Sequence, residues 1–449
     1  MKKLTLFVII IQLASGCKTD STTSSQSHLI SFADSLFKAN VDSSQIAGAS
    51  VLVYQDGKIL LDKSYGYASL ELSVPMPTHA SFEIGSVTKQ FTSAAILRLA
   101  EQGKLSLDDD FTKYLDFDTR GRTITIKHLL NHTSGIPGYT EMPEFEKLSM
   151  LSFERDTLVR IVEQKDFLFE PGEALIYNNS AYFFLGLIII KASGMRYIDY
   201  LNEQFFQPLG MANTYYCSTS EVVKNKAYGY SYSEDGLRQK EYLDHIWPFA
   251  GGSICSTTED LLIWMRALHE GKVFDKSQYS LLTTPGTLKD GSPIRYAFGL
   301  TNYSLYKNRM IGHGGGINGF VSETRYFPES GLYIICLVNT TGPNGATYFA
   351  NELTWKILTK GIDKSEKLDI VLQSLEGTYT GQARGRILTV EVKALNDILT
   401  FKTEGRDNTD TLKTYLGNNT WARGNDRIMF SDKRVSIDNV IGHFILKKI

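Results

Sequence analysis

The chain has 449 residues, of which 42% are hydrophobic and 21% are charged, as is typical of a globular protein long enough for more than one domain. Its formal net charge is −2 at pH 7 and its sequence contains no long basic run, so we expect no nucleic-acid partner.

The N-terminus predicts an export signal. Lys2 and Lys3 precede the apolar run Leu4–Ile11, and the small residues of "QLASGC" follow. This run is too short to span a bilayer as a mature helix, and the pattern is that of a signal peptide over residues 1–17. The polar, serine-rich residues 18–27 are suited to a flexible tether.

The end of this signal resembles that of bacterial lipoproteins, in which cleavage leaves a lipidated N-terminal cysteine. Here that residue is Cys17, although Ala14 stands where those signals prefer leucine. The resemblance implies a lipid-anchored protein of the bacterial cell envelope, periplasmic or at the outer membrane, with the lipid as its membrane contact. A secreted periplasmic protein without the lipid is the alternative.

The remaining cysteines are Cys217, Cys255 and Cys336. They are odd in number, far apart and free of any CxxC spacing. We therefore predict that they are buried small hydrophobic residues without a disulfide framework.

A first domain is predicted over residues 28–360. The segment "GASVLVYQDGKILLDKSYGYASL" predicts a β-hairpin with an Asp56-Gly57 turn, and residues 86–102 predict a helix that Gly103 ends. Strands return between residues 312 and 339. The helices expected between and after these strands cover residues 126–131, 153–163, 180–193, 260–269 and 351–358. Strands at both ends of a helical middle indicate one sheet in an α+β fold.

A second, all-β domain is predicted over residues 368–449. The alternation of Leu388, Val390 and Val392 is typical of half-buried strands, and several such short strands follow one another. We expect a small barrel or sandwich.

The stretch "EIGSVTKQF" brings Ser86 and Lys89 together at the start of the first long helix. Residues three apart lie on one face of a helix, and a helix N-terminus gathers unpaired N–H groups that could hold an oxyanion. Lys89 could activate Ser86 as a nucleophile if its pKa were lowered. The alternative is a helix cap at Ser86 and a solvated Lys89.

Two further stretches carry chemistry. "IYNNSAY" contains Tyr177 and Asn179, where a tyrosine held partly as phenolate could act as a base and the amide could bind a substrate; a helix cap beside a core tyrosine is the alternative. "GHGGGINGF" places His313, Gly314 and Gly315 at a strand that a ligand could approach closely; a bulge or tight bend is the alternative.

In this order, the three motifs resemble those of the serine β-lactamase and penicillin-binding-protein superfamily, in its class C-like branch. That branch includes class C β-lactamases, D-Ala-D-Ala carboxypeptidases, D-aminopeptidases and esterases. Stretches such as "LLNHTSGIPGY" and "PFAGGSICSTTEDLLIWMRAL" extend the resemblance from about Gln45 to Leu358. It implies a β-lactamase/transpeptidase-like fold, and the second domain resembles the lipocalin-like domains of some members.

The resemblance also implies roles. Ser86 would be the acylated nucleophile, with Lys89 and Tyr177 sharing the base work and Tyr177 returning the proton to the leaving group. Asn179, His313, Gly314 and Gly315 would bind the substrate. The oxyanion donors would be the backbone N–H groups of Ser86 and Gly316, and no cofactor is implied.

The third motif departs from the family's usual Lys-Thr-Gly. His313 is expected to be only partly charged near neutrality, and Gly314 has no hydroxyl. A substrate carboxylate should therefore bind more weakly here, which favours a peptidase or esterase over an efficient β-lactamase.

His128 and His132 have a spacing that can bind zinc, but no HExxH glutamate accompanies them, and we expect a structural or capping role and no metal.

The sequence thus predicts a cell-envelope serine hydrolase that acts through an acyl-enzyme on D-amino-acid-containing peptides, amides or esters, with peptidoglycan fragments among the candidate substrates. A class C-like β-lactamase and a catalytically silent envelope binding protein are the alternatives. The oligomeric state is left open.

Overall fold

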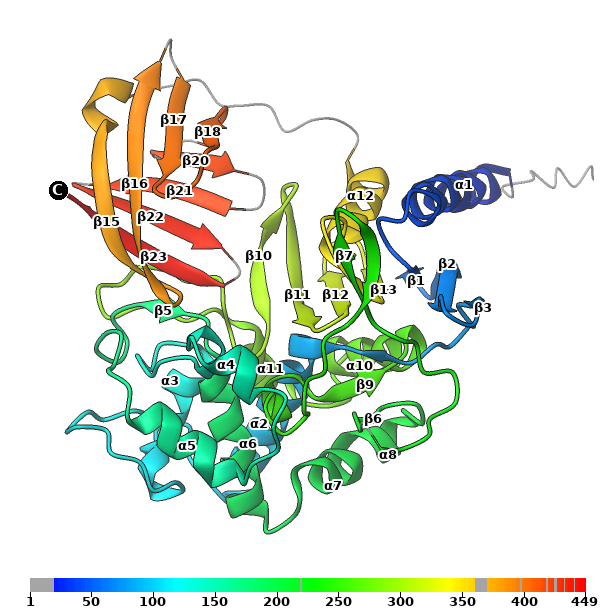
Figure 1. Cartoon of the computed structure of the whole chain (residues 1–449), viewed down its shortest axis with the longest axis horizontal. Coiled ribbons are helices and arrows are strands. Elements are labelled where there is room, and N and C mark those ends of the chain that lie inside the picture. Colours follow the sequence, from blue (N-terminus) through cyan, green and yellow to red (C-terminus); the bar gives the residue numbers. More distant parts are fainter. Residues whose placement is uncertain are drawn as a thin grey trace, which may run out of the picture.

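The computed structural model describes residues 20–218, 220–359, 370–395, 398–416, 419–423, 426–431, 433–439 and 441–449, with the side chains of residues 20–25 left out. Figure 1 shows three parts: a sheet between helices, a helical region below it, and a separate C-terminal set of strands. Cys17 lies outside the described residues, so its predicted lipidation stays a prediction.

An antiparallel sheet of seven strands forms the centre of the first part, and it joins strands from both ends of the region, as predicted. Its order is β10-β11-β12-β13-β1-β2-β3. The strands are β10 (Thr301–Leu305), β11 (Asn308–Ile317), β12 (Phe320–Phe327), β13 (Leu332–Val338), β1 (Gly48–Gln55), β2 (Lys58–Ser69) and β3 (Val74–Pro75). The α+β prediction is confirmed.

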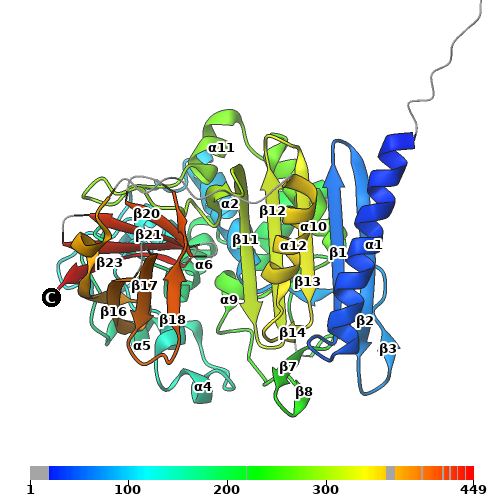
Figure 2. The ribbon, with the colours of Figure 1, turned by 90° about the horizontal axis from the view of Figure 1, so that it is seen from above.

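Helices cover both faces of this sheet (Figure 2), which explains why β1 is buried from Gly48 to Tyr54 and β13 over its full length. On one face α1 (Asp20–Asp42) and α12 (Ala346–Leu358) pack together, and the rings of Phe37 and Phe349 stack at 4.3 Å. On the other face lie α2 (Thr88–Glu101) and α10 (Thr258–His269), with Phe91 against Trp264 at 4.5 Å.

Part of the predicted tether is helical instead, because α1 begins at Asp20. The buried face of α1 starts at Leu29, and Gln26 donates hydrogen bonds to the carbonyls of Ile59 and Leu60. A helix that packing holds in place can extend by additional polar turns.

The helical region lies between the strands of the sheet in sequence. Its largest helix is α6 (Asn179–Ser193), which packs against α2. The others are α3 (Ile126–Leu130), α4 (Phe145–Leu148), α5 (Arg155–Glu163), α7 (Tyr197–Leu201), α8 (Gln207–Leu209), α9 (Phe249–Gly252) and α11 (Lys276–Thr283), with short helical turns η1 (Gly85–Val87), η2 (Phe111–Lys113), η3 (Tyr139–Glu141) and η4 (Asn202–Phe206). A further turn, η5 (Leu372–Leu375), precedes the C-terminal strands. Within the described chain no single helix could cross a membrane; only the bent pair Asn179–Ser193 and Tyr197–Leu209, at 75°, has the necessary length and composition.

A small three-stranded sheet lies beside the segment that contains Ser86, in the order β4-β9-β6. It consists of β4 (Phe82–Glu83), β9 (Ile254–Ser256) and β6 (Tyr215–Tyr216). A second small sheet has the order β14-β7-β8 and consists of β14 (Thr340–Thr341), β7 (Tyr230–Ser233) and β8 (Gly236–Gln239).

A disulfide joins Cys217 and Cys255 at the first of these sheets, so the prediction of two unpaired cysteines is wrong. The pairing of β6 with β9 brings the two residues to a Cα–Cα distance of 5.2 Å. Residues 38 apart carry no sequence signal of such a strand pairing. Cys336 is free and buried, as predicted.

We expect the double variant Cys217→Ser/Cys255→Ser to lose about 2–4 kcal/mol of unfolding free energy, because the bridge restricts the unfolded chain. Chemical denaturation with and without reductant measures this loss. The prediction would be contradicted if the variant and the wild type without reductant were equally stable. It would also be contradicted if both cysteines of the wild type reacted with a thiol reagent in denaturant without reductant.

The C-terminal strands form a nearly closed, barrel-like sheet, which confirms the predicted all-β character. Its order is β18-β17-β16-β15-β23-β22-β21-β20-β19, with β5 (Leu175–Ile176) paired to β23. The strands are β15 (Gly377–Ala383), β16 (Arg386–Leu395), β17 (Ile398–Thr403), β18 (Thr409–Leu412), β19 (Thr414–Tyr415), β20 (Thr420–Arg423), β21 (Asp426–Ser431), β22 (Arg434–Asn439) and β23 (Gly442–Lys448).

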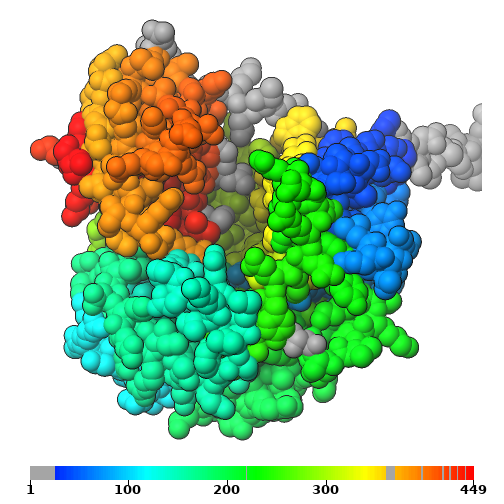
Figure 3. Space-filling model, in the orientation of Figure 1, coloured from blue at the N-terminus to red at the C-terminus, as the bar shows by residue number. Residues whose placement is uncertain are grey.

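The barrel packs against the helical region (Figure 3), and the strand before Tyr177 connects the two. In β5, Ile176 pairs with Gly442 of β23, and the Tyr177 N–H then donates to the Ile441 carbonyl at 2.9 Å. The backbone of a predicted catalytic residue is therefore held by the second domain.

Candidate active site

Ser86 lies in the turn η1, between β4 and α2. The side chains at this helix start cap no backbone N–H, so the interpretation of Ser86 as a cap is wrong. Gly85 has a positive φ of 50°, and a Cβ there would lie 2.9 Å from the Gly316 nitrogen. Only glycine therefore permits the close approach of this turn to β11.

Lys89 is fully buried one turn further along, and its amine nitrogen is at the centre of the site. Nζ lies 3.0 Å from Ser86 Oγ, 2.9 Å from Asn179 Oδ1 and 2.7 Å from the Gly251 carbonyl oxygen. Burial lowers the pKa of Lys89 well below its usual value, and the positive charge of Arg384 adds to this effect while Glu141 opposes it.

A neutral amine fits these three contacts. It has two N–H groups, which can donate to the Gly251 carbonyl oxygen and to Asn179 Oδ1, the two nearer acceptors. Its lone pair then faces Ser86, whose hydroxyl donates. In this state the hydrogen bond of 3.0 Å is directed for transfer of the serine proton to Lys89.

Tyr177 directly precedes α6, whose N-cap is Asn178. Its ring lies 4.8 Å from Lys89 Nζ, and its buried hydroxyl has no hydrogen-bond partner within the described chain. Burial raises the pKa of Tyr177, and the positive charge of Arg384 only partly opposes this effect. The residue is therefore a neutral phenol near pH 7, which corrects the expectation of a partial phenolate and makes it a proton donor.

His313 lies in β11 and is neutral. Burial lowers its pKa to about 3, against an opposing hydrogen bond to Gly314. Nδ1 donates to the Gly314 carbonyl at 2.5 Å, so Nε2 accepts from the Tyr296 hydroxyl at 2.9 Å. The expected partial charge at this position is therefore wrong, and His313 offers no cation to a substrate.

We expect Tyr296→Phe to lose about 1–3 kcal/mol of stability, because it leaves the buried His313 Nε2 without a donor. Chemical denaturation measures this, with Tyr232→Phe at the half-buried strand β7 as the control. Equal stability of the two variants would contradict a stabilising hydrogen bond between Tyr296 and His313.

The glycines of β11 allow this strand to lie close to the turn η1 that contains Ser86. A Cβ at Gly315 would lie 2.1 Å from the Ile84 carbonyl oxygen and 3.0 Å from the Ser86 nitrogen. Gly316 follows, paired with Val321 of β12, and a Cβ there would meet nothing within 4 Å. The backbones that carry the two predicted oxyanion donors, Ser86 and Gly316, are thus adjacent.

These residues line one cleft of about 360 Å³. The predicted site residues among its walls are Ser86, Tyr177, Asn179, His313, Gly314, Gly315 and Gly316. Lys89 lies directly behind Ser86. The sequence motifs therefore meet, although the first and the last lie more than two hundred residues apart along the chain.

His128 and His132 do not share a site. His128 forms a capping box with Thr125, and His132 Nδ1 accepts the Asn178 N–H at 3.2 Å. The His132 ring packs against Tyr177 at 4.3 Å and Tyr296 at 4.5 Å. These are the structural and capping roles that the sequence indicates.

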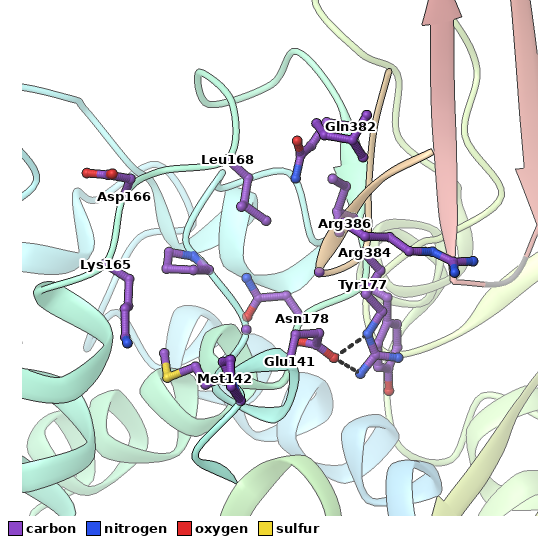
Figure 4. A pocket seen from close by; sticks show the side chains of 16 residues that line it. Glu141, Met142, Lys165, Asp166, Leu168, Tyr177, Asn178, Gln382, Arg384 and Arg386 are labelled. Carbon is purple, nitrogen blue, oxygen red and sulfur yellow. Dashed lines mark hydrogen bonds and ion pairs between the residues drawn. The ribbon is translucent and has the colours of Figure 1, made fainter. Parts of the chain in front are cut away.

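Arg384, at the turn between β15 and β16, is a residue of the cleft that the sequence did not reveal. Its Nε donates to Glu141 Oε1 at 2.5 Å, and its guanidinium carbon lies 5.2 Å from the Tyr177 ring centroid. Figure 4 shows Arg384 and Glu141 joined beside Tyr177. The barrel thus supplies a cation to a site whose third motif has none.

A sheet flanked by helices, with a serine, a buried lysine and a tyrosine beside one of its strands, is the arrangement found in serine hydrolases that act through an acyl-enzyme. Residues 33–359 match the family model described as Beta-lactamase. The chain belongs to this family.

Two curated relatives support the assignment. Penicillin-binding protein 4* of Bacillus subtilis is 33% identical over 303 residues, which cover 64% of this chain and 66% of the relative. Protein flp of Staphylococcus aureus is 30% identical over 315 residues, covering 68% and 62%. The chain thus spans slightly less than two thirds of the length of these relatives.

Two solved structures share the fold. The octameric penicillin-binding protein homologue from Pyrococcus abyssi is 25% identical, with a TM-score of 0.66 over 93% of this chain and 99% of that one. The D-amino acid amidase from Ochrobactrum anthropi SV3, in complex with D-phenylalanine, is 25% identical, with a TM-score of 0.63 over 74% and 98%.

Proposed function

We propose that the protein is a serine hydrolase that cleaves D-amino-acid-containing peptides, amides or esters through an acyl-enzyme on Ser86. The observation that carries this proposal is the contact of 3.0 Å between Ser86 Oγ and the buried Lys89 amine, whose pKa is lowered. The alternative of a silent binding protein gives no reason to bury a lysine beside this serine.

In the acylation step, Ser86 Oγ bonds to the substrate carbonyl carbon while Lys89 Nζ takes the serine proton. The negative charge on the carbonyl oxygen is held by the N–H groups of Ser86 and Gly316. When the bond to the leaving group breaks, the Tyr177 hydroxyl gives it a proton, and the proton on Lys89 restores the phenol. Water then hydrolyses the acyl-enzyme by the same steps in reverse order.

A D-configured substrate is supported by the likeness to the D-amino acid amidase. The neutral His313 and the absent hydroxyl at Gly314 disfavour an efficient class C-like β-lactamase, whose substrate carries a carboxylate at this position. Peptidoglycan fragments are natural candidates among D-amino-acid-containing peptides.

We further propose that the protein acts in the bacterial cell envelope. The signal pattern before Cys17 supports export, and the Cys217–Cys255 disulfide is a second argument, because such bonds persist in oxidising compartments. Metabolic labelling with a radioactive fatty acid, compared between wild type and Cys17→Ala, tests the lipid anchor.

A substrate panel tests the proposed reaction. We expect wild type to hydrolyse D-phenylalanine amide and short-chain esters, and L-phenylalanine amide more slowly. A chromogenic cephalosporin cleaved faster than every amide and ester would establish the β-lactamase alternative. If none of these compounds were turned over or formed a covalent adduct, the alternative of a catalytically silent binding protein would remain.

A further inference from the structure

The mouth of the C-terminal barrel contains a second pocket, of about 400 Å³. Residues two apart on a strand point to the same side, so the buried Leu388, Phe401 and Phe444 lie inside the barrel. These side chains form an apolar floor, as in small barrels that hold a ligand.

Arginines surround this pocket. The four that line it are Arg384, Arg386, Arg406 and Arg423. Arg423 donates to Asp410 and Asp426, at 3.0 Å each, and Arg384 pairs with Glu141. Arg386 and Arg406 have no carboxylate partner among the residues that the structure describes. Among the described residues, the four arginines of the mouth thus face three paired carboxylates, Glu141, Asp410 and Asp426, and the guanidinium groups of Arg386 and Arg406 pair with none of these three.

The arginine-lined pocket adjoins the catalytic cleft. Arg384, Asp426 and Ile441 line both. In Figure 4, Arg384 points toward Glu141 and Tyr177, whereas Arg386 extends away from them toward the strands of the barrel. One side of a substrate held at Ser86 can thus reach the barrel mouth.

The position of Arg384 indicates which side of the substrate this is. Its guanidinium lies over the ring of Tyr177, 5.2 Å from the centroid. In the mechanism proposed above Tyr177 gives its proton to the leaving group, so the leaving group faces the barrel.

A further acid of the cleft, Glu323, forms an ion pair with the buried Arg325 at 2.9 Å.

We propose that the arginine-lined mouth of the barrel binds carboxylates on the leaving-group side of the substrate. This inference rests on the proposed hydrolase function and makes amides and peptides with a carboxylate on the leaving group its preferred substrates. Guanidinium groups bind carboxylates with two parallel hydrogen bonds, and the apolar floor can hold the methylene carbons between them.

Two matched probes test this inference: D-phenylalanyl-glycyl-glutamate and its analogue with both carboxylates replaced by carboxamides. We expect wild type to prefer the acidic probe by roughly 10-fold in kcat/KM, and added salt to reduce this preference. The variant Arg386→Gln/Arg406→Gln should lose the preference while it cleaves the neutral probe at the wild-type rate. Arg434→Gln, on an exposed part of β22, is the control and should change neither rate.

Equal kcat/KM for the two probes in wild type would overturn the inference while the hydrolase function stands. If neither probe is cleaved, the hydrolase function fails for them, and binding still decides the inference. Ser86→Ala protein should then bind the acidic probe roughly 10-fold more tightly than the neutral one, and the two Arg→Gln changes should remove that difference. Equal dissociation constants would refute it.

Discussion

Ser86→Ala is expected to reduce kcat/KM for every amide and ester substrate by roughly 10³- to 10⁶-fold, because it removes the atom that forms the acyl-enzyme. The fold should persist, since Ser86 Oγ caps no helix and its hydrogen bond is with the Lys89 amine. Initial rates on the best substrate of the panel, with thermal unfolding of both proteins, measure the effect.

The matched control is Ser277→Ala, an exposed serine in the first turn of α11. It should keep wild-type rates. A Ser86→Ala protein that retained more than about a tenth of the wild-type rate would assign the nucleophile to another residue.

Lys89→Met is expected to reduce kcat/KM by roughly 10²- to 10⁴-fold, the usual contribution of a general base. It should also change how stability depends on pH. In the folded wild type Lys89 has a lowered pKa and stays neutral, whereas in the unfolded chain it binds a proton below the ordinary lysine pKa of about 10.4. Wild-type stability therefore falls as the pH is lowered from about 10 toward the depressed pKa, by about 1.4 kcal/mol per pH unit from this group.

The methionine variant lacks this contribution. The difference in unfolding free energy between variant and wild type should thus move in favour of the variant as the pH is lowered from about 10 to about 7. Denaturant titrations at a series of pH values measure it. Parallel curves for the two proteins would mean that Lys89 is charged in the folded state and is not the base.

The sequence predicted those parts of the site that depend on short segments. Ser86 and Lys89 share a helix face, and Asn178 is an N-cap, so local rules place these residues correctly. The β-hairpin at Asp56-Gly57 and the alternating strands of the barrel were predictable for the same reason.

The parts that the sequence did not predict depend on contacts between distant segments. Nothing in "GQARGR" tells which face of the barrel meets Glu141, and no spacing pairs Cys217 with Cys255. The charge of His313 was expected from the ordinary pKa of histidine, but burial lowers that pKa in the fold and leaves the ring neutral. Burial likewise makes Tyr177 a phenol, through its raised pKa.

The intact mass of the protein after exposure to a penicillin tests the central claim most directly, because it detects the acyl-enzyme itself. We predict one adduct of the penicillin's mass, located on Ser86 by peptide mapping and absent from Ser86→Ala. An adduct on any other residue, or an equal adduct on Ser86→Ala, would contradict the assignment of Ser86 as the nucleophile.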